Sequence, residues 1–478
     1  MTHRRPTTIP AMLLHLARLH PAHAGAALAV TAAGALAAGL ALRPAPAAPP
    51  AGRVTVFPAS PASPVARSVL GVGVCSTRPV VCVSDATCGA GARCVDPNDL
   101  RGLVLRHRSP GTREDEIPVF PAMAWGGEGY GLAWSGLSDE SADVWFARAS
   151  AAGQRLGNPV RVTRSPSVKV FPSVAASPAG YAVTWTDIRD DGDVSVWMQR
   201  LDRAGAAQGQ PARIPQGAGL SLLPRVVWNG REYAVLWYHL ASQSDLSVRF
   251  ARFTPDGARV GSDATVAAGV LPTGAPGFAW MGDGYGAAWS TIAPRGNEGQ
   301  TMFARIGAGG EASTPFRVSS VRGQNGAVTL AWAKGHFGAV WEDDVTLDDE
   351  EAALGRLAFA GVTPTSLAVP RRELTPRDAL YTQPSLAWTG AQYGLTWARV
   401  GSDGADVYFR RLDDKGQNVG DPLKFTAGAI GIFPTLAWSG TEFAVAWTHL
   451  GARGFQLRFG RIDANGRRVG NDGVIAGD

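Results

Sequence analysis

YAVTW at 181–185 is one of seven versions of the same short apolar stretch. The other six are YGLAW (130–134), YAVLW (233–237), YGAAW (285–289), FGAVW (337–341), YGLTW (393–397) and FAVAW (443–447). Their final tryptophans follow one another at intervals of 51, 52, 52, 52, 56 and 50 residues. A fixed period near 50 residues built from short strands is typical of equal sheets arranged in a ring, so the repeat predicts a β-propeller.

One copy shows how the repeat becomes a blade. Strand A (FPSVAAS, 171–177) is followed by strand B (YAVTW), strand C (VSVWMQRLD, 194–202) and strand D (QPARIP, 210–215). Short alternating runs divided by Gly- and Asp-bearing turns are typical of an antiparallel meander. The sequence therefore predicts an all-β fold in which residues 119–478 form a seven-bladed β-propeller of four-stranded antiparallel blades.

Two residue types recur at fixed places in the repeat. Thirteen of the 15 tryptophans stand at the ends of strands A and B, which favours the core between blades over a ligand cage. An arginine also recurs in strand C, and we expect it to be a structural donor to turns, with a ring of anion sites as the alternative. These arginines are Arg148, Arg200, Arg252, Arg305, Arg356, Arg411 and Arg461.

The segment 1–50 has the features of an export signal. Its uncharged run 24–42 follows a basic start and precedes Ala45-Pro46-Ala47, which suits signal cleavage; an uncleaved membrane anchor is the alternative. The first 53 residues hold five arginines and no acid, and the rest of the chain holds 40 basic and 40 acidic residues. The formal charge of +5 is therefore a targeting feature and does not indicate a nucleic-acid partner.

A Pro/Ala/Ser-rich linker (51–70) leads to a Cys-rich segment (71–100) and a connector (101–118). The segment holds all four cysteines of the chain, Cys75, Cys82, Cys88 and Cys94. In an exported chain this predicts a small knot with two disulfides, of which three connectivities are possible. A zinc site is the weaker alternative, because the spacing lacks Cys-x-x-Cys pairs.

The repeat also carries a resemblance. WTDIRDDGDVSVWMQRLDRAG (185–205) resembles a repeat of exported bacterial propellers, approximately W-x-D-x-R-x-x-x-x-D-I-Y-x-x-R-L-D-x-x-G, and 401–420 and 454–470 match its second half. This resemblance covers 119–478 and implies an extracellular or surface location, usually without an assigned reaction. The fifth copy (341–357) departs from it in a longer acidic loop and in lacking the Asp-Val/Ile-Tyr element. The Cys-rich segment, with its D-x-x-C-G-x-G-x-x-C ending, resembles small modules of exported bacterial proteins.

Candidate binding residues follow strand B. A meander places the B–C and D–A connections on one face of the ring, and the B–C loops vary most between copies, so we expect a ligand on this B–C face. Polar side chains that stand two positions after a strand-B tryptophan are the candidates: Asp187, His239, Asp343, Arg399 and His449. A solvated rim of loops without a ligand is the alternative.

Calcium is the only cofactor that the sequence suggests. Asp190, Asp191 and Asp193 lie in one B–C loop, and hard cations prefer several flexible oxygen ligands. No EF-hand loop or nonapeptide array is present in the sequence, so calcium is expected as a possible guest only.

No catalytic motif is recognised, and no catalytic residue is predicted. The sequence lacks a Gly-x-Ser-x-Gly elbow, an HExxH helix, a P-loop and a sialidase-type Asp box. We therefore expect an exported binding or surface-interaction module that holds a protein or glycan at the cell surface, touching membrane only through 1–50 if that segment is uncleaved. The alternative is an exported hydrolase that acts on glycans with loop carboxylates.

Overall fold

The computed structural model describes residues 73–75, 81–82, 94–95, 117–138, 141–189, 191–242, 245–293, 298–347, 353–401, 404–426, 429–451 and 453–477. Every regular element in these ranges is a β-strand, and no helix within them is long and apolar enough to cross a membrane. The predicted segments 1–50 and 51–70 lie outside the described residues, as do most of 71–100 and 101–118.

Three short strands belong to the Cys-rich segment: β1 (Gly73–Cys75), β2 (Val81–Cys82) and β3 (Cys94–Val95). They pair antiparallel in the order β2-β1-β3, with Cys75 opposite Cys94 in the backbone register. The cysteine side chains lie outside the described part of the chain, so the two disulfides stay a prediction.

From Ile117 onwards the strands form successive four-stranded antiparallel meanders, each in the order A–B–C–D. The first two are β4 (Ile117–Trp125), β5 (Gly129–Leu137), β6 (Ala142–Ser150), β7 (Arg155–Arg161), and β8 (Val168–Ser177), β9 (Gly180–Ile188), β10 (Val194–Asp202), β11 (Ala207–Arg213). Next come β12 (Leu220–Trp228), β13 (Tyr233–Ser242), β14 (Asp245–Phe253), β15 (Arg259–Ala268), and β16 (Gly277–Trp280), β17 (Gly284–Ile292), β18 (Gly299–Gly307), β19 (Phe316–Val321). Then follow β20 (Val328–Ala333), β21 (His336–Leu347), β22 (Ala353–Val362) and β23 (Leu367–Glu373). The last are β24 (Leu380–Trp388), β25 (Tyr393–Gly401), β26 (Gly404–Leu412), β27 (Asn418–Lys424), and β28 (Ile430–Trp438), β29 (Glu442–Gly451), β30 (Gly454–Asp463), β31 (Arg468–Ala476).

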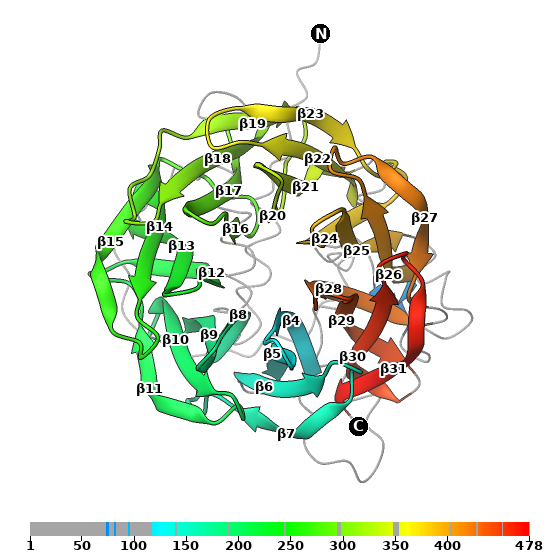
Figure 1. The fold of residues 1–478 in the computed structure, drawn as a ribbon, viewed down its shortest axis with the longest axis horizontal. Helices are drawn as coiled ribbons and strands as arrows, with labels where there is room; N and C mark the ends of the chain where they lie inside the picture. Colours follow the sequence, from blue (N-terminus) through cyan, green and yellow to red (C-terminus); the bar gives the residue numbers. More distant parts are fainter. Residues whose placement is uncertain are drawn as a thin grey trace, which may run out of the picture.

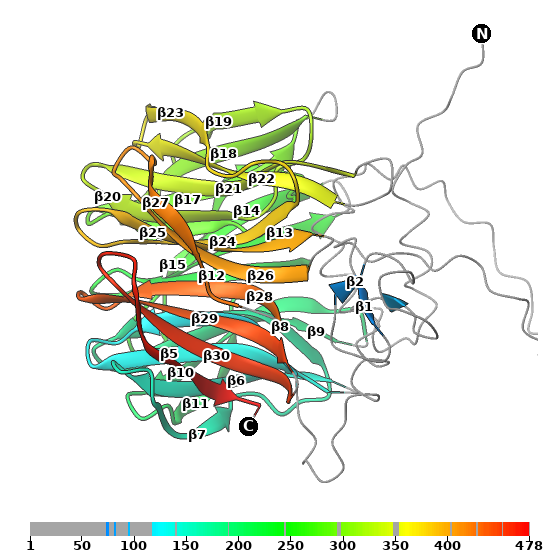
Figure 2. The ribbon, with the colours of Figure 1, turned by 90° about the vertical axis from the view of Figure 1, so that its right-hand side faces the viewer.

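The meanders stand side by side around a central axis, with the A strands innermost and the D strands on the rim (Figure 1). Five of them are separate sheets, whereas β4–β7 and β8–β11 share one eight-stranded sheet through a single parallel pair, Ala142 and Val168. Seen from the side, the ring is a disc whose strands run between its two faces (Figure 2). This is a β-propeller arrangement.

The strand-B tryptophans fill the space between neighbouring sheets, as the sequence predicts. All seven are buried, with exposed fractions from 0% to 3%. Around them, a strand-C phenylalanine of one sheet meets the strand-B tyrosine or phenylalanine of the next; Phe146 and Tyr181, for example, have ring centroids 5.0 Å apart. Such contacts place large flat groups where the wedge between radial sheets is widest.

The Tyr/Phe-Gly pair of the repeat has a packing reason. A Cβ on Gly131 would lie 2.4 Å from the Tyr181 ring, and one on Gly394 would lie 2.4 Å from Phe443. The missing Cβ lets the aromatic ring of the next sheet approach the backbone at these two glycines, whereas three other copies have alanine at this position, namely Ala182, Ala234 and Ala444.

The ring closes by the same contacts that join its other sheets. Phe459 of the last sheet packs on Tyr130 of the first, with centroids 5.2 Å apart. Thr448 Oγ1 donates to the Pro118 carbonyl at 2.8 Å, and an Arg155 terminal nitrogen donates to the Ile475 carbonyl at 3.2 Å. The alternative closing strands that the sequence offers, 54–57 and 103–107, lie outside the described residues.

Each of five A strands contains a β-bulge that the sequence analysis missed. The bulged residue has a positive φ and precedes a proline in each case, as in Phe171-Pro172 (φ 55°). The five are Phe120, Phe171, Leu223, Gln383 and Phe433. A positive φ is an outlier for a bulky residue, and a proline after it suits an irregular point in a strand.

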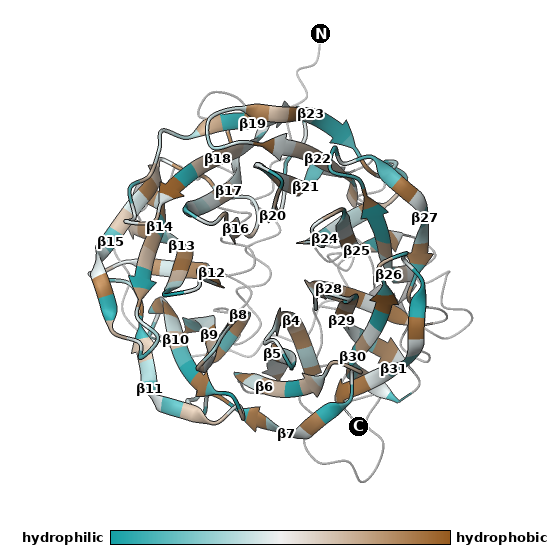
Figure 3. Ribbon diagram, in the orientation of Figure 1, coloured by the Kyte–Doolittle hydropathy of each residue, from teal (hydrophilic) through white to brown (hydrophobic). Residues whose placement is uncertain are grey.

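The strand-C arginines act on turns and strand edges, which agrees with the structural role expected for them. Arg252 pairs with Glu232 at 3.2 Å and Arg461 with Glu442 at 3.0 Å, in each case reaching the A–B turn of the same sheet. The fifth copy also forms a complete strand C, β22, although it lacks the Asp-Val/Ile-Tyr element. Hydrophilic residues are frequent along the rim strands (Figure 3), consistent with their exposure to solvent.

Candidate functional site

The two faces of the disc differ in regularity. On the face of the A–B and C–D turns, six C–D turns repeat one hydrogen bond, in which a glycine N–H donates to the carbonyl three residues earlier at 2.9–3.0 Å. Their glycines are Gly153, Gly205, Gly257, Gly310, Gly416 and Gly466. On the opposite face, the B–C connections are 138–141, 189–193, 243–244, 293–298, 348–352, 402–403 and 452–453, which differ in length and composition.

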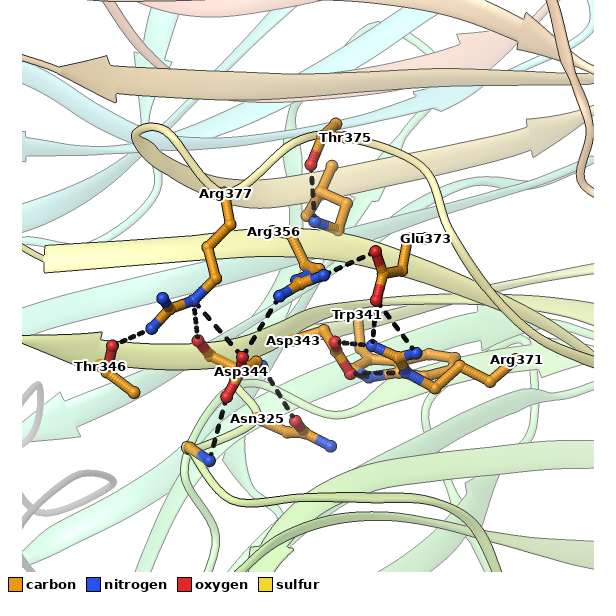
Figure 4. A network of polar contacts seen from close by, with 12 residues as sticks. Asn325, Trp341, Asp343, Asp344, Thr346, Arg356, Arg371, Glu373, Thr375 and Arg377 are labelled. Carbon is orange, nitrogen blue, oxygen red and sulfur yellow. Dashed lines mark hydrogen bonds and ion pairs between the residues drawn. The ribbon is translucent and has the colours of Figure 1, made fainter.

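Asp343 lies inside the β20–β23 sheet (Figure 4). Its carboxylate is fully buried and accepts from Trp341 Nε1 at 2.8 Å and from Arg371 Nε at 3.3 Å. The hydrogen bond from Arg371 to Asp343 also raises the pKa of the arginine. Asp343 is thus engaged by donors of its own sheet.

Asp344, the next residue, organises the loop beside it (Figure 4). Its carboxylate accepts from the Gly323 N–H at 3.1 Å and pairs with Arg356 and Arg377, both at 3.4 Å. The acidic cluster of the fifth copy therefore holds its own connections together, at least through the two aspartates that the structure describes.

Asp187 is buried between the first two meanders. Its carboxylate accepts a short hydrogen bond from Ser167 Oγ, and burial raises its pKa. Close by, Lys169 is fully buried and lies 3.2 Å from Asp143, while its ammonium donates to the Ser167 carbonyl at 2.8 Å. Burial lowers the pKa of Lys169 although Asp143 acts in the opposite direction. This cluster ties the two meanders together.

The remaining candidates differ in exposure. His239 is buried, and its Nδ1 lies 2.8 Å from Ser221 Oγ. His449 is half-buried, its Nδ1 has no hydrogen-bond partner among the described residues, and burial lowers its pKa to about 4, an effect to which Arg458 adds. Arg399 lies 3.9 Å from Asp378. The five candidates therefore occupy equivalent places in five meanders, two positions after the strand-B tryptophan of each.

The calcium candidates are only partly described. Asp190 lies outside the described residues. Asp191 Oδ1 accepts from the Asp193 N–H at 3.1 Å, and Asp193 lies 3.5 Å from Arg213. Within the ranges that the structure describes, no three His, Cys, Asp or Glu side chains are grouped so that they could hold a metal ion.

The aspartate of the Asp-Val-Trp/Tyr element is a structural residue, a role that the sequence analysis did not assign. Asp143 and Asp406 accept from a threonine at the end of strand D, Thr163 at 2.6 Å and Thr426 at 2.7 Å. Each threonine oxygen also accepts a strand-C backbone N–H, that of Val407 in the second case. The repeated Val/Phe-Thr that follows strand D in these two copies is the sequence signal that could have revealed this bridge.

A second missed feature lies along the axis. The rings of Phe120, Phe171 and Phe433 come from three inner strands, and Phe120 lies 4.7 Å and 4.5 Å from the other two. Across the inner ring, Glu342 accepts from the Gln383 N–H at 2.8 Å, and burial raises its pKa. Three aromatic rings therefore meet at the inner strands β4, β8 and β28, and a buried carboxylate of β21 holds the inner strand β24.

Comparison with known proteins finds only distant structural likenesses. No protein-family model and no curated protein matches this chain. Among solved structures, the propeller domain of the Trilobed protease from Pyrococcus furiosus is similar at 8% identity and a TM-score of 0.44, over 76% of this chain and 97% of that one. The acylaminoacyl peptidase of Pyrococcus horikoshii is similar at 9% identity and a TM-score of 0.45, over 76% and 52%. Trypanosoma rangeli sialidase is similar at 9% identity and a TM-score of 0.41, over 74% and 70%. A prolyl endopeptidase, first among these matches, shares 12% identity at a TM-score of 0.44, and this chain spans 50% of its length.

Proposed function

We propose that the chain is an exported binding module that holds a protein or glycan on its B–C face. The observation that carries the proposal is the contrast between the two faces. One face repeats the same turn hydrogen bond in six copies, whereas the other joins equally regular strands by connections of two to six residues. Variable loops on a rigid scaffold are the usual arrangement of a binding surface.

The proposal includes the blade count. Each antiparallel meander is taken as one blade, so that residues 117–477 form seven, the first two joined by the bridge between Ala142 and Val168. The repeated contact between strand-C and strand-B aromatics, from Phe146 on Tyr181 to Phe459 on Tyr130, supports equal blades in a closed ring. An experimental structure with six or eight blades would overturn the count.

Loop residues beyond the strand ends are the better candidates for contact with a partner. Asp187, His239 and Asp343 are buried, so their replacement would disturb the fold together with any binding. Arg189, Asp191 and Glu298 are exposed on B–C connections. Side chains of both charges there suit a polar partner such as a protein or a glycan.

The test is capture from the native culture medium and envelope fraction by the exported protein. Replacing Arg189, Asp191 and Glu298 together with serine should reduce the captured partner at least tenfold, without a change in Tm. The matched control replaces exposed residues of the opposite face, Arg231, Asp283 and Lys415, and should leave capture unchanged. Equal loss in both triple variants, or none in either, contradicts the placement of the partner on the B–C face.

A glycan array separates the binding module from the hydrolase alternative. Saturable binding without a released product supports the module, whereas release of sugar supports the hydrolase. A calcium-dependent rise in Tm that is lost when Asp190, Asp191 and Asp193 are replaced by asparagine would support a calcium site in the same loop. Export itself is tested by locating the mature N-terminus in cell fractions.

A further inference from the structure

A small polar cavity lies between the β8–β11 and β12–β15 meanders. Its volume is about 40 Å³, and its lining is Pro215, Gln216, Trp237, His239, Arg249 and Asp263. A single water needs roughly 10–15 Å³ measured in this way, so the cavity accepts a few waters or one small ion but no sugar or side chain.

Two side chains that line this cavity, Trp237 and Arg249, are hydrogen-bond donors. Trp237 is fully buried, and its Nε1 has no hydrogen-bond partner among the described residues. Arg249 uses its Nε on Ser247 Oγ at 3.0 Å, which leaves its terminal nitrogens for the cavity. An unmatched buried N–H costs about 1–3 kcal/mol, so an acceptor that meets these donors is stabilising.

When Arg259, the neighbouring partner of the lining residue Asp263, is counted, the charges around the cavity leave one positive charge over. Asp263, the acid of the cavity, pairs with Arg259 and also accepts from the Gln216 N–H at 2.8 Å. The guanidinium of Arg249 has no carboxylate partner in the described structure. A monovalent anion in contact with Arg249 and the Trp237 indole would balance that charge.

The last meander repeats this arrangement. WTHL (447–450) corresponds to WYHL (237–240), and RVGND (468–472) corresponds to RVGSD (259–263). The backbone register is also the same, because Arg249 stands opposite Trp237 and Arg458 stands opposite Trp447. In the other five copies the residue opposite the tryptophan is Trp145, Trp197, Met302, Ala358 or Tyr408.

The second copy has its own unmatched groups. Trp447 Nε1 and His449 Nδ1 are buried and have no hydrogen-bond partner in the part of the chain that the structure describes. Arg458 directs its Nε and one terminal nitrogen to Gln456 Oε1, and Asp472 pairs with Arg468. The same three groups, a tryptophan, a histidine and an arginine, therefore surround both places.

We propose that the β12–β15 and β28–β31 sheets each hold one small monovalent anion of halide size, bound between the tryptophan indole N–H and the arginine guanidinium. The two sites share the tryptophan, the histidine and the arginine, but the histidine Nδ1 lies 2.8 Å from Ser221 Oγ in the first and has no partner among the described residues in the second. The first site is independent of the proposed partner on the B–C face, since a cavity of about 40 Å³ excludes a macromolecular ligand.

Bromide is the probe for the test. Crystals of the full exported chain grown in sodium bromide should show anomalous peaks within hydrogen-bond distance of Trp237 Nε1 and Trp447 Nε1. In Arg249→Met, the first peak should disappear while the second remains, and Arg458→Met should give the converse. The control Arg231→Met, an exposed arginine of the opposite face, should keep both peaks.

Solution measurements provide a second readout. Replacing chloride by bromide or nitrate at constant ionic strength should shift the Tm of the parent protein, and the shift should shrink by at least half in the double variant R249M/R458M. Absence of bromide from both proposed sites in the parent crystals overturns the proposal, as does bromide that persists there in both arginine variants. The parent crystals alone decide the matter if the variants do not fold.

Discussion

Replacing Asp343 with alanine should destabilise the propeller far more than a change at its neighbour Asp344. Asp343 is 0% exposed and accepts from Trp341 Nε1 at 2.8 Å and from Arg371. Loss of the acceptor leaves a buried indole N–H unmatched, at a cost of about 1–3 kcal/mol, and breaking a buried ion pair costs about 3–5 kcal/mol. The Arg371 side chain is 30% exposed and has Glu373 as a second partner at 3.3 Å, so it recovers part of its loss. Because the Arg371 end of the pair is partly solvated, we expect about 1 kcal/mol from the ion pair and about 2 kcal/mol from the unmatched indole, a total of about 3 kcal/mol.

Thermal unfolding measures this effect. The repeat region spans 360 residues (119–478). At ~2.1 cal/mol/K per residue its unfolding entropy is about 0.75 kcal/mol/K, so 3 kcal/mol lowers Tm by roughly 4 °C if the ring unfolds as one unit. Asp343→Asn keeps an acceptor for Trp341 and should lose about half as much.

Asp344→Asn is the matched control. Asn keeps the acceptor for the Gly323 N–H and tolerates the φ of 53° at this position. The lost ion pairs join partly exposed side chains, and such pairs contribute up to about 1 kcal/mol, or roughly 1 °C here. Equal shifts in D343A and D344N, or a D343A protein within one degree of the parent, would refute the assignment of Asp343 as an internal acceptor.

Three further predictions concern other sheets. The pKa of His449 is lowered from 6.5 to about 4, so its contribution to stability is present above pH 6.5 and is lost as the pH falls towards 4. The Tm of the parent should therefore fall more steeply over this pH range than the Tm of His449→Gln. Parallel curves of Tm against pH would contradict the lowered pKa. Gly416 and Gly420 have similar φ values, 71° and 74°. A Cβ on Gly416 would lie 2.1 Å from the Phe359 ring, whereas a Cβ on Gly420 would meet nothing within 4 Å. Gly416→Ala should therefore lower Tm several-fold more than Gly420→Ala. Thr426→Val removes the acceptor of the buried Val407 N–H and the donor to Asp406. It should lower the free energy of unfolding, measured in urea, by about 1–3 kcal/mol, whereas Thr426→Ser should be close to the parent.

The architecture could be predicted because its causes repeat in the sequence. Each strand-B tryptophan stands at the same phase as the others, and a residue that returns seven times in a fold of equal sheets is explained by sheet-to-sheet packing. The same holds for the strand-C arginines, which reach turn acids such as Glu232 and Glu442 within their own sheets. Prediction succeeded where one contact is made many times.

Single contacts between distant residues could not be predicted in this way. Asp143 meets Thr163 across 20 residues and Lys169 from the next meander, and neither partner belongs to the Asp-Val-Trp element that contains the aspartate. The inner bulges were missed for a different reason. Phe-Pro and Leu-Pro pairs recur in strand A, as at 171–172 and 223–224. A proline in a strand indicates an irregular point, but it does not by itself predict a positive φ at the residue before it.

The placement of the binding candidates follows from strand periodicity. Side chains alternate between the two faces of a strand, so a residue two positions after a tryptophan points to the same side as the tryptophan. Since the strand-B tryptophans are buried between sheets, the positions of Asp187, His239 and Asp343 are buried for the same reason. Of the three, His239 lines the cavity beside Trp237, whose volume of about 40 Å³ is too small for a protein or a glycan. We therefore expect the proposed partner to contact residues beyond the ends of the strands, which is why the capture experiment replaces Arg189, Asp191 and Glu298 and leaves the buried polar residues intact.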